Sequence, residues 1–238
     1  MNTFLTLLND DLSALIHSWV VWIWLLVTVI AGISAIVIGR AYTDSTSFIL
    51  SWALYLYMAF GSTMVIVLCA SAASTELSYL GNALMSRGVT PLHYILAKIL
   101  ARLLTIQGMF FIVVLPVSFI MMHYGGHNDM EWRGILLGLT YISLLLGILV
   151  MLGVTFSTFI TNLLVAVSLL SILWFTGLGV YLVSEHRGFS PEGLLGVLPL
   201  ILQGSYQMGD NWLILGCLVV PILILPLLSL YLFSGRDL

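Results

Sequence analysis

The sequence predicts an all-α integral membrane protein with six transmembrane helices, an N-terminal interfacial helix and a short re-entrant helix hairpin before the last span. Hydrophobic residues make up 61% of the 238 residues and charged residues 7%, whereas about a quarter of residues in soluble domains are charged. The mean hydropathy is +1.15, and the apolar runs show no strand-like alternation. Helices satisfy their own backbone polar groups, as a bilayer requires. We expect one membrane domain over residues 1–238.

Six apolar stretches are long enough to cross a bilayer, which takes about 20 residues. They are Trp19 to Ile38, Phe48 to Ala73, Leu103 to Met122, Ile135 to Phe156, Leu163 to Val183 and Trp212 to Phe233. The two cysteines, Cys69 and Cys217, each lie inside an apolar stretch, so we expect no disulfide between them.

The segment from Asn2 to His17 precedes the first span and has the pattern of an amphipathic helix. Its apolar residues recur at helical spacing: Phe4, Leu8, Leu12, Leu15 and Trp19. This pattern predicts a helix that lies in the membrane interface. The alternative is a frayed polar lead-in to the first span. Residues 1–11 lack a basic start and a small-residue cleavage site, so we expect no cleaved signal peptide.

A polar element follows the second span, and we expect residues 76–93 to form a cytoplasmic coupling element. After Glu76, three leucines recur at spacings of three and four residues, which predicts a short helix with one apolar stripe: Leu77, Leu80 and Leu84. Gly88 follows Ser86 and Arg87, and glycine tolerates the left-handed conformation that ends many helices.

The next helix is predicted to begin well before its apolar part. Thr90 precedes Pro91, a capping side chain followed by the residue suited to the first helical position. Tyr94, Lys98 and Arg102 then repeat every four residues and share one face. This face either orients the coupling element for a partner or reaches out to lipid head groups.

Residues 184–211 are too polar to cross the membrane and too apolar for a simple loop. Pro191 between Ser190 and Glu192 resembles a helix start, and the apolar run that follows is too short for a span. We therefore expect an extracytoplasmic short-helix hairpin, kinked at Pro199, on the face opposite the coupling element.

Several classes of function are excluded by missing motifs. The only lysine, Lys98, is not part of a G-x-x-x-x-G-K-[ST] phosphate loop, so this chain is not expected to hydrolyse ATP. No H-E-x-x-H zinc signature is present, and no charged residue lies in the middle of a predicted span, where proton relays need one. The net charge of −3 and the lack of a basic stripe give no reason to expect nucleic acid. We expect no catalytic residue, cofactor or metal in this chain.

The remaining polar residues of the spans are mild and are expected to serve packing or to bond back to their own helices. They are Gln107, Ser118, Thr140, Ser143, Ser168, Ser171 and Thr176. Gly134 and Gly138 have the spacing of a close helix contact, and the small residues from Cys69 to Ser74 favour the same.

Three histidines support a competing hypothesis, a metal- or cofactor-handling protein of the outer face. Imidazole ligands suit copper and zinc. His123 and His127 flank Gly125 and Gly126, which disfavour the helix that would align them, and His186 is expected on the same face. A membrane assembly factor without a transported substrate is a further alternative.

At residue level the coupling element resembles the cytoplasmic stretch of the type-2 class of ABC exporter permeases. The resemblance is carried by Glu76, the run Leu-Met-Ser-Arg-Gly-Val over residues 84–89, Tyr94 and Lys98. The last eight residues, Tyr-Leu-Phe-Ser-Gly-Arg-Asp-Leu, are similar to the ending of the branch with the nitrous-oxide-reductase maturation and gliding-motility permeases. Many members of that family have proline where this chain has Gly88.

The resemblance implies a permease subunit that pairs with a second permease copy, as a homodimer or a related heterodimer. Two separate ATP-binding cassette subunits would supply ATP and magnesium and hold the coupling helix, here Glu76 to Arg87, in a groove. The partner-coupling residues it implies are Glu76, Leu77, Leu80, Leu84, Ser86, Arg87, Tyr94 and Lys98. The other partner is membrane lipid.

We expect a multi-pass protein of the inner or plasma membrane with a cytoplasmic N-terminus. With that orientation four basic residues lie inside, against three outside: Arg87, Lys98, Arg102 and Arg236, against Arg40, Arg133 and Arg187. The excess follows the positive-inside rule by a single residue.

Overall fold

The structure, a computed structural model, describes residues 3–41, 45–86, 90–125, 129–160, 162–183, 191–205 and 208–234. These residues form eight helices and, within these ranges, no strand. The helices are α1 (Thr3–Ile16), α2 (Trp19–Ala41), α3 (Thr46–Ser86), α4 (Pro91–Tyr124), α5 (Trp132–Phe159), α6 (Leu163–Val183), α7 (Pro191–Leu202) and α8 (Met208–Ser234). The all-helical class predicted from the sequence is confirmed for this part of the chain.

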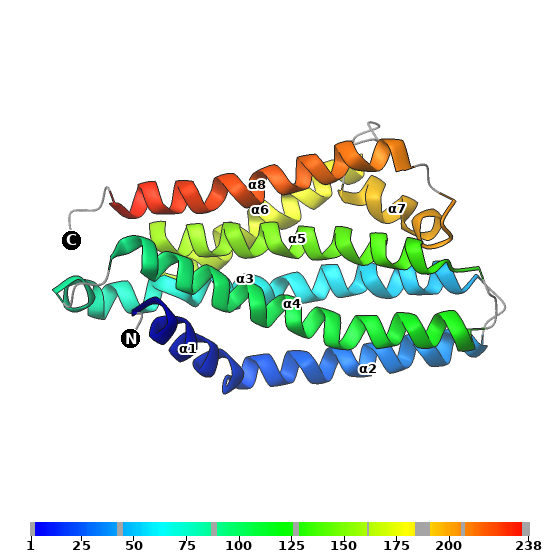
Figure 1. Ribbon diagram of the computed structural model, residues 1–238, viewed down its shortest axis with the longest axis horizontal. Helices are drawn as coiled ribbons and strands as arrows, with labels where there is room; N and C mark the ends of the chain where they lie inside the picture. The colour runs from blue at the N-terminus through cyan, green and yellow to red at the C-terminus, as the bar shows by residue number, and fades with distance from the viewer. Residues whose placement is uncertain are drawn as a thin grey trace.

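The long helices run side by side as an elongated bundle (Figure 1). The start of α4, the last turns of α3 and α1 lie at one end, which we call the α1 end. The starts of α3 and α5, the end of α4 and the short helix α7 lie at the other, which we call the α7 end.

Four described helices are long and apolar enough to cross a membrane. They comprise Trp19–Ala41, Thr46–Ala72, Leu92–Tyr124 and Trp132–Phe159. In α6 and α8 the described apolar stretches are shorter, Leu163–Thr176 and Leu218–Tyr231. The chain therefore has the character of a multi-pass membrane protein, and the fifth and sixth spans stay predictions.

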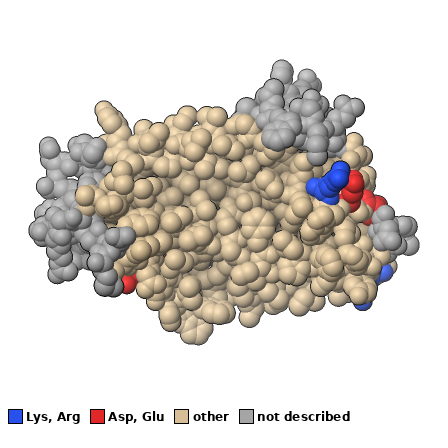
Figure 2. All heavy atoms as spheres, in the orientation of Figure 1, with Lys and Arg blue, Asp and Glu red and all other residues tan. Residues whose placement is uncertain are grey.

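Charged side chains keep to the two ends of the bundle on the face that Figure 2 shows. Among the described residues of this face, the middle band carries neither Lys or Arg nor Asp or Glu (Figure 2). An uncharged band of this kind suits the hydrocarbon core, which is about 30 Å thick.

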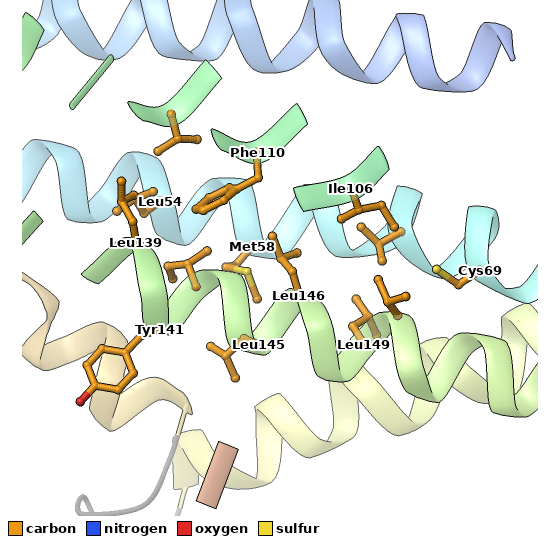
Figure 3. Packing of buried hydrophobic residues seen from close by; sticks show 14 of the residues in the cluster. Leu54, Met58, Cys69, Ile106, Phe110, Leu139, Tyr141, Leu145, Leu146 and Leu149 are labelled. Carbon is orange, nitrogen blue, oxygen red and sulfur yellow. The ribbon is translucent and has the colours of Figure 1, made fainter. Parts of the chain in front are cut away.

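Helix α5 is the central element of the bundle. In its most apolar stretch 61% of the residues are buried, against 22% in α2, which lies at the periphery. Such a helix is apolar all round because it meets neighbours on every side. Figure 3 shows Ile106 and Phe110 pointing from α4 toward α5, with Met58 of α3 and Leu146 of α5 packed nearby.

Small residues permit the closest helix contacts, as the sequence predicts. A side chain at Gly153 of α5 would stand 2.4 Å from the Cβ atom of Cys69 on α3. At the α7 end, a Cβ at Gly134 would stand 2.1 Å from the carbonyl oxygen of Ile201. Gly138, one turn further along α5, lies under the side chains of Leu198 and Leu202. The C-terminal turn of α7 therefore rests directly on the backbone of α5.

Hydroxyl groups of the spans bond mainly to their own helices. Ser118 donates to the carbonyl oxygen of Val114 (2.8 Å), and Thr140 to that of Leu136 (2.7 Å). Gln107 and Ser143 instead join α4 to α5 through two hydrogen bonds of 2.7 and 2.8 Å. These contacts confirm the packing role predicted for these four residues.

A second polar contact fastens α7 to the start of α3, and we call it the α7-end polar cluster (Ser47, Asp129 and Gln203). The Asp129 carboxylate accepts from the backbone N–H of Ser47 (3.2 Å) and from its hydroxyl (2.6 Å). Gln203 donates to the same hydroxyl oxygen at 2.8 Å. A carboxylate at a helix N-terminus satisfies free N–H groups and complements the helix dipole. One side chain thus caps the 41-residue helix α3.

Helix α7 agrees with the hairpin expected over residues 184–211 in two respects. It begins at Pro191, and it lies at the end of the bundle opposite the predicted coupling element (Figure 1). It ends because Gly204 adopts a left-handed conformation, with φ +70°, and the N–H of Ser205 bonds to the carbonyl oxygen of Leu200 at 3.1 Å. The re-entrant course of α7 stays a prediction, and residues 184–190 and 206–207 lie outside the described residues.

The close approach of α7 to Gly134 can be tested by adding one methyl group. We expect Gly134→Ala to lower the free energy of unfolding by about 1–3 kcal/mol, because the backbone of α7 must move away. The thermal midpoint in detergent should fall by about 2–10 °C.

Gly108→Ala is the matched control, because a Cβ there meets nothing within 4 Å. Alanine has the higher helix propensity, so this variant should unfold at the same temperature or slightly above it. An equal midpoint in both variants would show that α7 does not rest on Gly134.

Candidate functional site

The predicted coupling element forms the last turns of α3. The sequence analysis expected a short helix after the second span, and the structure has a helix over these residues up to Ser86. This helix is continuous with the second span, because α3 runs from Thr46 to Ser86 without a break. No glycine or proline lies between Ser62 and Leu80, so nothing ends the helix where its apolar stretch ends. From Ala72 to Ser86 the helix continues for about 21 Å at 1.5 Å per residue.

Much of the predicted docking surface lies outside the described part of the chain. The backbone of five of its residues belongs to α3, but their side chains lie outside the described residues: Glu76, Leu77, Leu80, Leu84 and Ser86. Arg87 and Gly88 also lie outside, so the predicted helix end at Gly88 is untested beyond the fact that α3 ends at Ser86.

The predicted start of α4 is confirmed. Thr90 has an extended conformation (φ −74°, ψ 143°), and its hydroxyl oxygen accepts from the backbone N–H of His93 at 3.4 Å. Pro91 is the first helical residue. The cap fixes where the chain re-enters the bundle after the α3–α4 connection.

The most highly charged described site is an ion cluster at the α1 end, formed by Asp11, Lys98 and Arg102. Lys98 Nζ lies 2.6 Å from one carboxylate oxygen of Asp11, and an Arg102 guanidinium nitrogen lies 3.2 Å from the other. All three side chains are largely buried, with 7%, 6% and 14% of Lys98, Arg102 and Asp11 exposed. We call this group the α1-end ion cluster.

Arg102 extends the cluster to a third helix. Its Nε donates to the backbone carbonyl oxygen of Leu68 on α3 at 3.2 Å. The guanidinium nitrogen that faces Asp11 also donates to the carbonyl oxygen of Lys98 at 3.3 Å. Burying charge is tolerated only where the charges are paired and hydrogen-bonded. The cluster meets this condition and joins α1, α3 and α4.

Tyr94, Lys98 and Arg102 share a face of α4 as predicted, but this face turns inward. Tyr94 is only 3% exposed, and Lys98 Nζ lies 5.4 Å from the centre of the Tyr94 ring. The two side chains predicted to orient the element for a partner therefore contact other parts of the same chain. In this structure Lys98 pairs with Asp11 of α1.

Helix α1 is also held by its apolar stripe. Leu8, Leu12 and Leu15 pack around Val21 of α2, Leu68 of α3 and Ala101 of α4. Phe4 lies beside His93, with 6.2 Å between ring centres. The amphipathic pattern correctly predicts a helix, and the frayed lead-in is wrong for these residues. The stripe predicted to face lipid faces the bundle, except that Trp19 is 82% exposed.

Asp11 is the residue that the sequence analysis missed. The available signal was charge complementarity, because two adjacent carboxylates on α1, Asp10 and Asp11, and a Lys–Arg pair one turn apart on α4 are rare in so apolar a chain. Helical periodicity assigned each charge to a face of its own helix. It did not indicate that the two faces meet.

The histidine hypothesis gains no support from the described residues. His123 is exposed, bonds to the carbonyl oxygen of Phe119 at 3.1 Å and lies against the Phe119 ring. His127 and His186 lie outside the described residues. Among the side chains that the structure describes, no three histidine, cysteine or acidic groups come together to hold a metal ion.

The contribution of the α1-end ion cluster to the free energy of unfolding can be measured with the variant Asp11→Asn. The substitution leaves two buried cations without their carboxylate, so we expect the free energy of unfolding to fall by about 1.5–3 kcal/mol. Hydrogen exchange should rise across residues 3–16, because α1 loses its polar attachment to α4.

Asp10→Asn removes the same charge from the exposed neighbouring position and is the control. It should leave both stability and exchange of α1 unchanged. Equal exchange in the two variants would show that the ion cluster does not hold α1.

Comparison with known proteins adds no family to this geometry. No model of a protein family matches the chain, and no curated protein matches it. What is established is a helical chain whose four long apolar helices are suited to a membrane. Its activity and partners are matters for proposal.

Proposed function

We propose that this chain is the transmembrane permease subunit of an ATP-driven exporter of the ABC type. In this proposal six spans form one half of the membrane unit, and a second permease copy forms the other. A separate ATP-binding cassette subunit hydrolyses ATP on the cytoplasmic side, where the N-terminus lies, at the inner or plasma membrane. In this proposal the chain lines the transport pathway with helices that move during the cycle, and it supplies no catalytic residue.

The observation that carries the proposal is the extension of α3 past its apolar stretch. In the sequence the apolar run of this helix ends at Ala73, and the helix continues to Ser86 at the α1 end (Figure 1). A rigid helix that leaves the membrane by about 21 Å is a suitable lever for a partner subunit. The sequence of this extension is the one that resembles the coupling stretch of type-2 permeases.

The α1-end ion cluster supports the same reading. A force applied to the end of α3 or the start of α4 is useful only if it reaches the spans without bending the chain. Arg102 bonds to Leu68 of α3 and to Asp11 of α1, so these helices move together near the base of the lever. Packed elements linked by hydrogen bonds carry such coupling.

Charge reversal at the proposed docking site is the decisive experiment. We expect Arg87→Glu to reduce copurification of the ATP-binding subunit by about tenfold or more, because reversing an interface charge turns attraction into repulsion. The partner is an ATP-binding protein encoded beside this chain or recovered with it. ATP-driven transport in reconstituted vesicles should fall in parallel, with the thermal midpoint unchanged.

Arg133→Glu supplies the matched control, because Arg133 is exposed at the α7 end. This variant should retain both the ATP-binding subunit and transport. Full transport by Arg87→Glu, or by a variant lacking residues 76–84, would refute the docking assignment. Transport by this chain alone, without an ATP-binding subunit, would refute the proposed function.

A further inference from the structure

A groove of about 750 Å³ runs between α2 and α3, with α4 as its floor. Its volume lies within the range of about 300–1,000 Å³ that is usual for small-molecule sites. The floor is formed by Val113, Val114 and Val117, and the contact of Gly32 with Val117 closes it. The walls are almost entirely apolar.

The groove opens on the outer surface of the bundle, where a membrane protein meets lipid. Side chains along its rim are strongly exposed: Val27 by 53%, Trp52 by 52% and Phe60 by 71%. It extends from Trp24 to Ile38 along α2, which is about 21 Å at 1.5 Å per residue. A narrow apolar groove of this length suits an extended hydrocarbon chain.

Two hydrogen-bond donors in the groove have no protein partner among the described residues. The hydroxyls of Thr28, Ser34 and Thr63 donate to carbonyl oxygens of their own helices. The indole N–H of Trp24, a side chain only 3% exposed, has no acceptor, and the Tyr57 hydroxyl makes no hydrogen bond. An unsatisfied N–H group is costly where no water reaches it.

Gly61 of α3 lies beside the Trp24 indole N–H and the Tyr57 ring. It lines the groove, and a Cβ there would stand 3.5 Å from Trp24 Nε1 and 3.7 Å from two atoms of the Tyr57 ring. The Trp24 and Tyr57 rings stack with 6.0 Å between their centres. An apolar ring with a polar edge is the side chain that proteins place where hydrocarbon meets polar groups.

The depth of the stacked Trp24 and Tyr57 rings indicates which atom would reach the Tyr57 hydroxyl. Trp24 is about 7.5 Å along α2 from Trp19, less than two turns from the α1 end of that span. The ester groups of a glycerolipid lie at the boundary of the hydrocarbon region, and each ester offers a carbonyl oxygen but no donor. A packed helix, by contrast, uses its backbone carbonyl oxygens in its own hydrogen bonds.

We propose that this groove binds one acyl chain of a bilayer glycerolipid. The carbonyl oxygen of the ester accepts from the Tyr57 hydroxyl, and the chain runs between α2 and α3 toward Ile38. The site is separate from the proposed docking of an ATP-binding subunit, and its test requires no transport.

Photolabelling of the purified full chain in lipid nanodiscs tests this site. The discs consist of phosphatidylglycerol and phosphatidylethanolamine with a small fraction of a diester phospholipid that carries a diazirine on one acyl chain. Mass spectrometry should find the label concentrated in residues 27–38 and 48–64. An unlabelled diester lipid should compete about two- to tenfold better than a diether lipid, which lacks the carbonyl oxygen.

Two pairs of variants separate specific binding from general contact with lipid. Ala31→Phe fills the groove from an exposed position, and we expect labelling to fall at least fivefold. Ile33→Phe adds bulk to an exposed position outside the groove and should label normally. Tyr57→Phe removes one donor and should weaken competition by the diester lipid about two- to tenfold, whereas Tyr55→Phe should not.

Four results would overturn the proposal. Labelling spread evenly over the exposed faces of α2, α6 and α8 would show an ordinary lipid shell. Unchanged labelling in Ala31→Phe would place the chain elsewhere, and equal competition by the diether lipid would remove the role of the carbonyl oxygen. Crosslinks between two protein copies across the groove would show that a second copy occupies it.

Discussion

The apolar environment of the spans is the constraint on which the rest of this structure depends. Between helices immersed in lipid, burial of hydrocarbon provides little driving force, so close packing and polar contacts must hold the bundle together. The described contacts follow this rule. Glycine lies at the tightest approaches, Gly153 against Cys69 and Gly134 against the end of α7. At the two ends of the bundle, polar clusters join pairs of helices that have no close glycine contact.

The two polar clusters act on different helices and by different means. At the α7 end, Asp129 caps α3 and Gln203 ties α7 to the same serine, mostly through neutral donors. At the α1 end, one carboxylate meets two cations, and the cluster binds α1 to the base of α4 and to α3. A charged cluster resists separation more strongly, because any loss of contact leaves a buried charge unpaired.

Helical periodicity predicted where helices form better than it predicted where they end or which helices they contact. The Thr90–Pro91 start of α4 and the glycine contacts follow from local chemistry, and the structure has both. The end of the second span was inferred from hydropathy alone. Hydropathy reports where lipid ends and not where the helix ends, so the sequence did not predict that the second span and the helix up to Ser86 are one continuous helix.

The burial of Lys98 shows a second reason why sequence reasoning fell short. A lysine near a span end has two ordinary environments, lipid head groups and a partner protein, and both are outside the chain. The third, a carboxylate 87 positions away, requires knowing that α1 folds back on α4. No pattern within α4 contains that information, because the partner lies on another helix.

The burial of these charges is better explained by geometry than by stability. A buried ion pair contributes little net stability compared with apolar side chains of similar size. It does, however, penalise any arrangement in which Asp11 is not opposite Lys98 and Arg102. Apolar packing alone would let α1 slide along α4, since leucine contacts are similar one turn further along. The ion cluster therefore specifies one position of α1, and a helix that leaves the bundle next to it, as α3 does, starts from a fixed base.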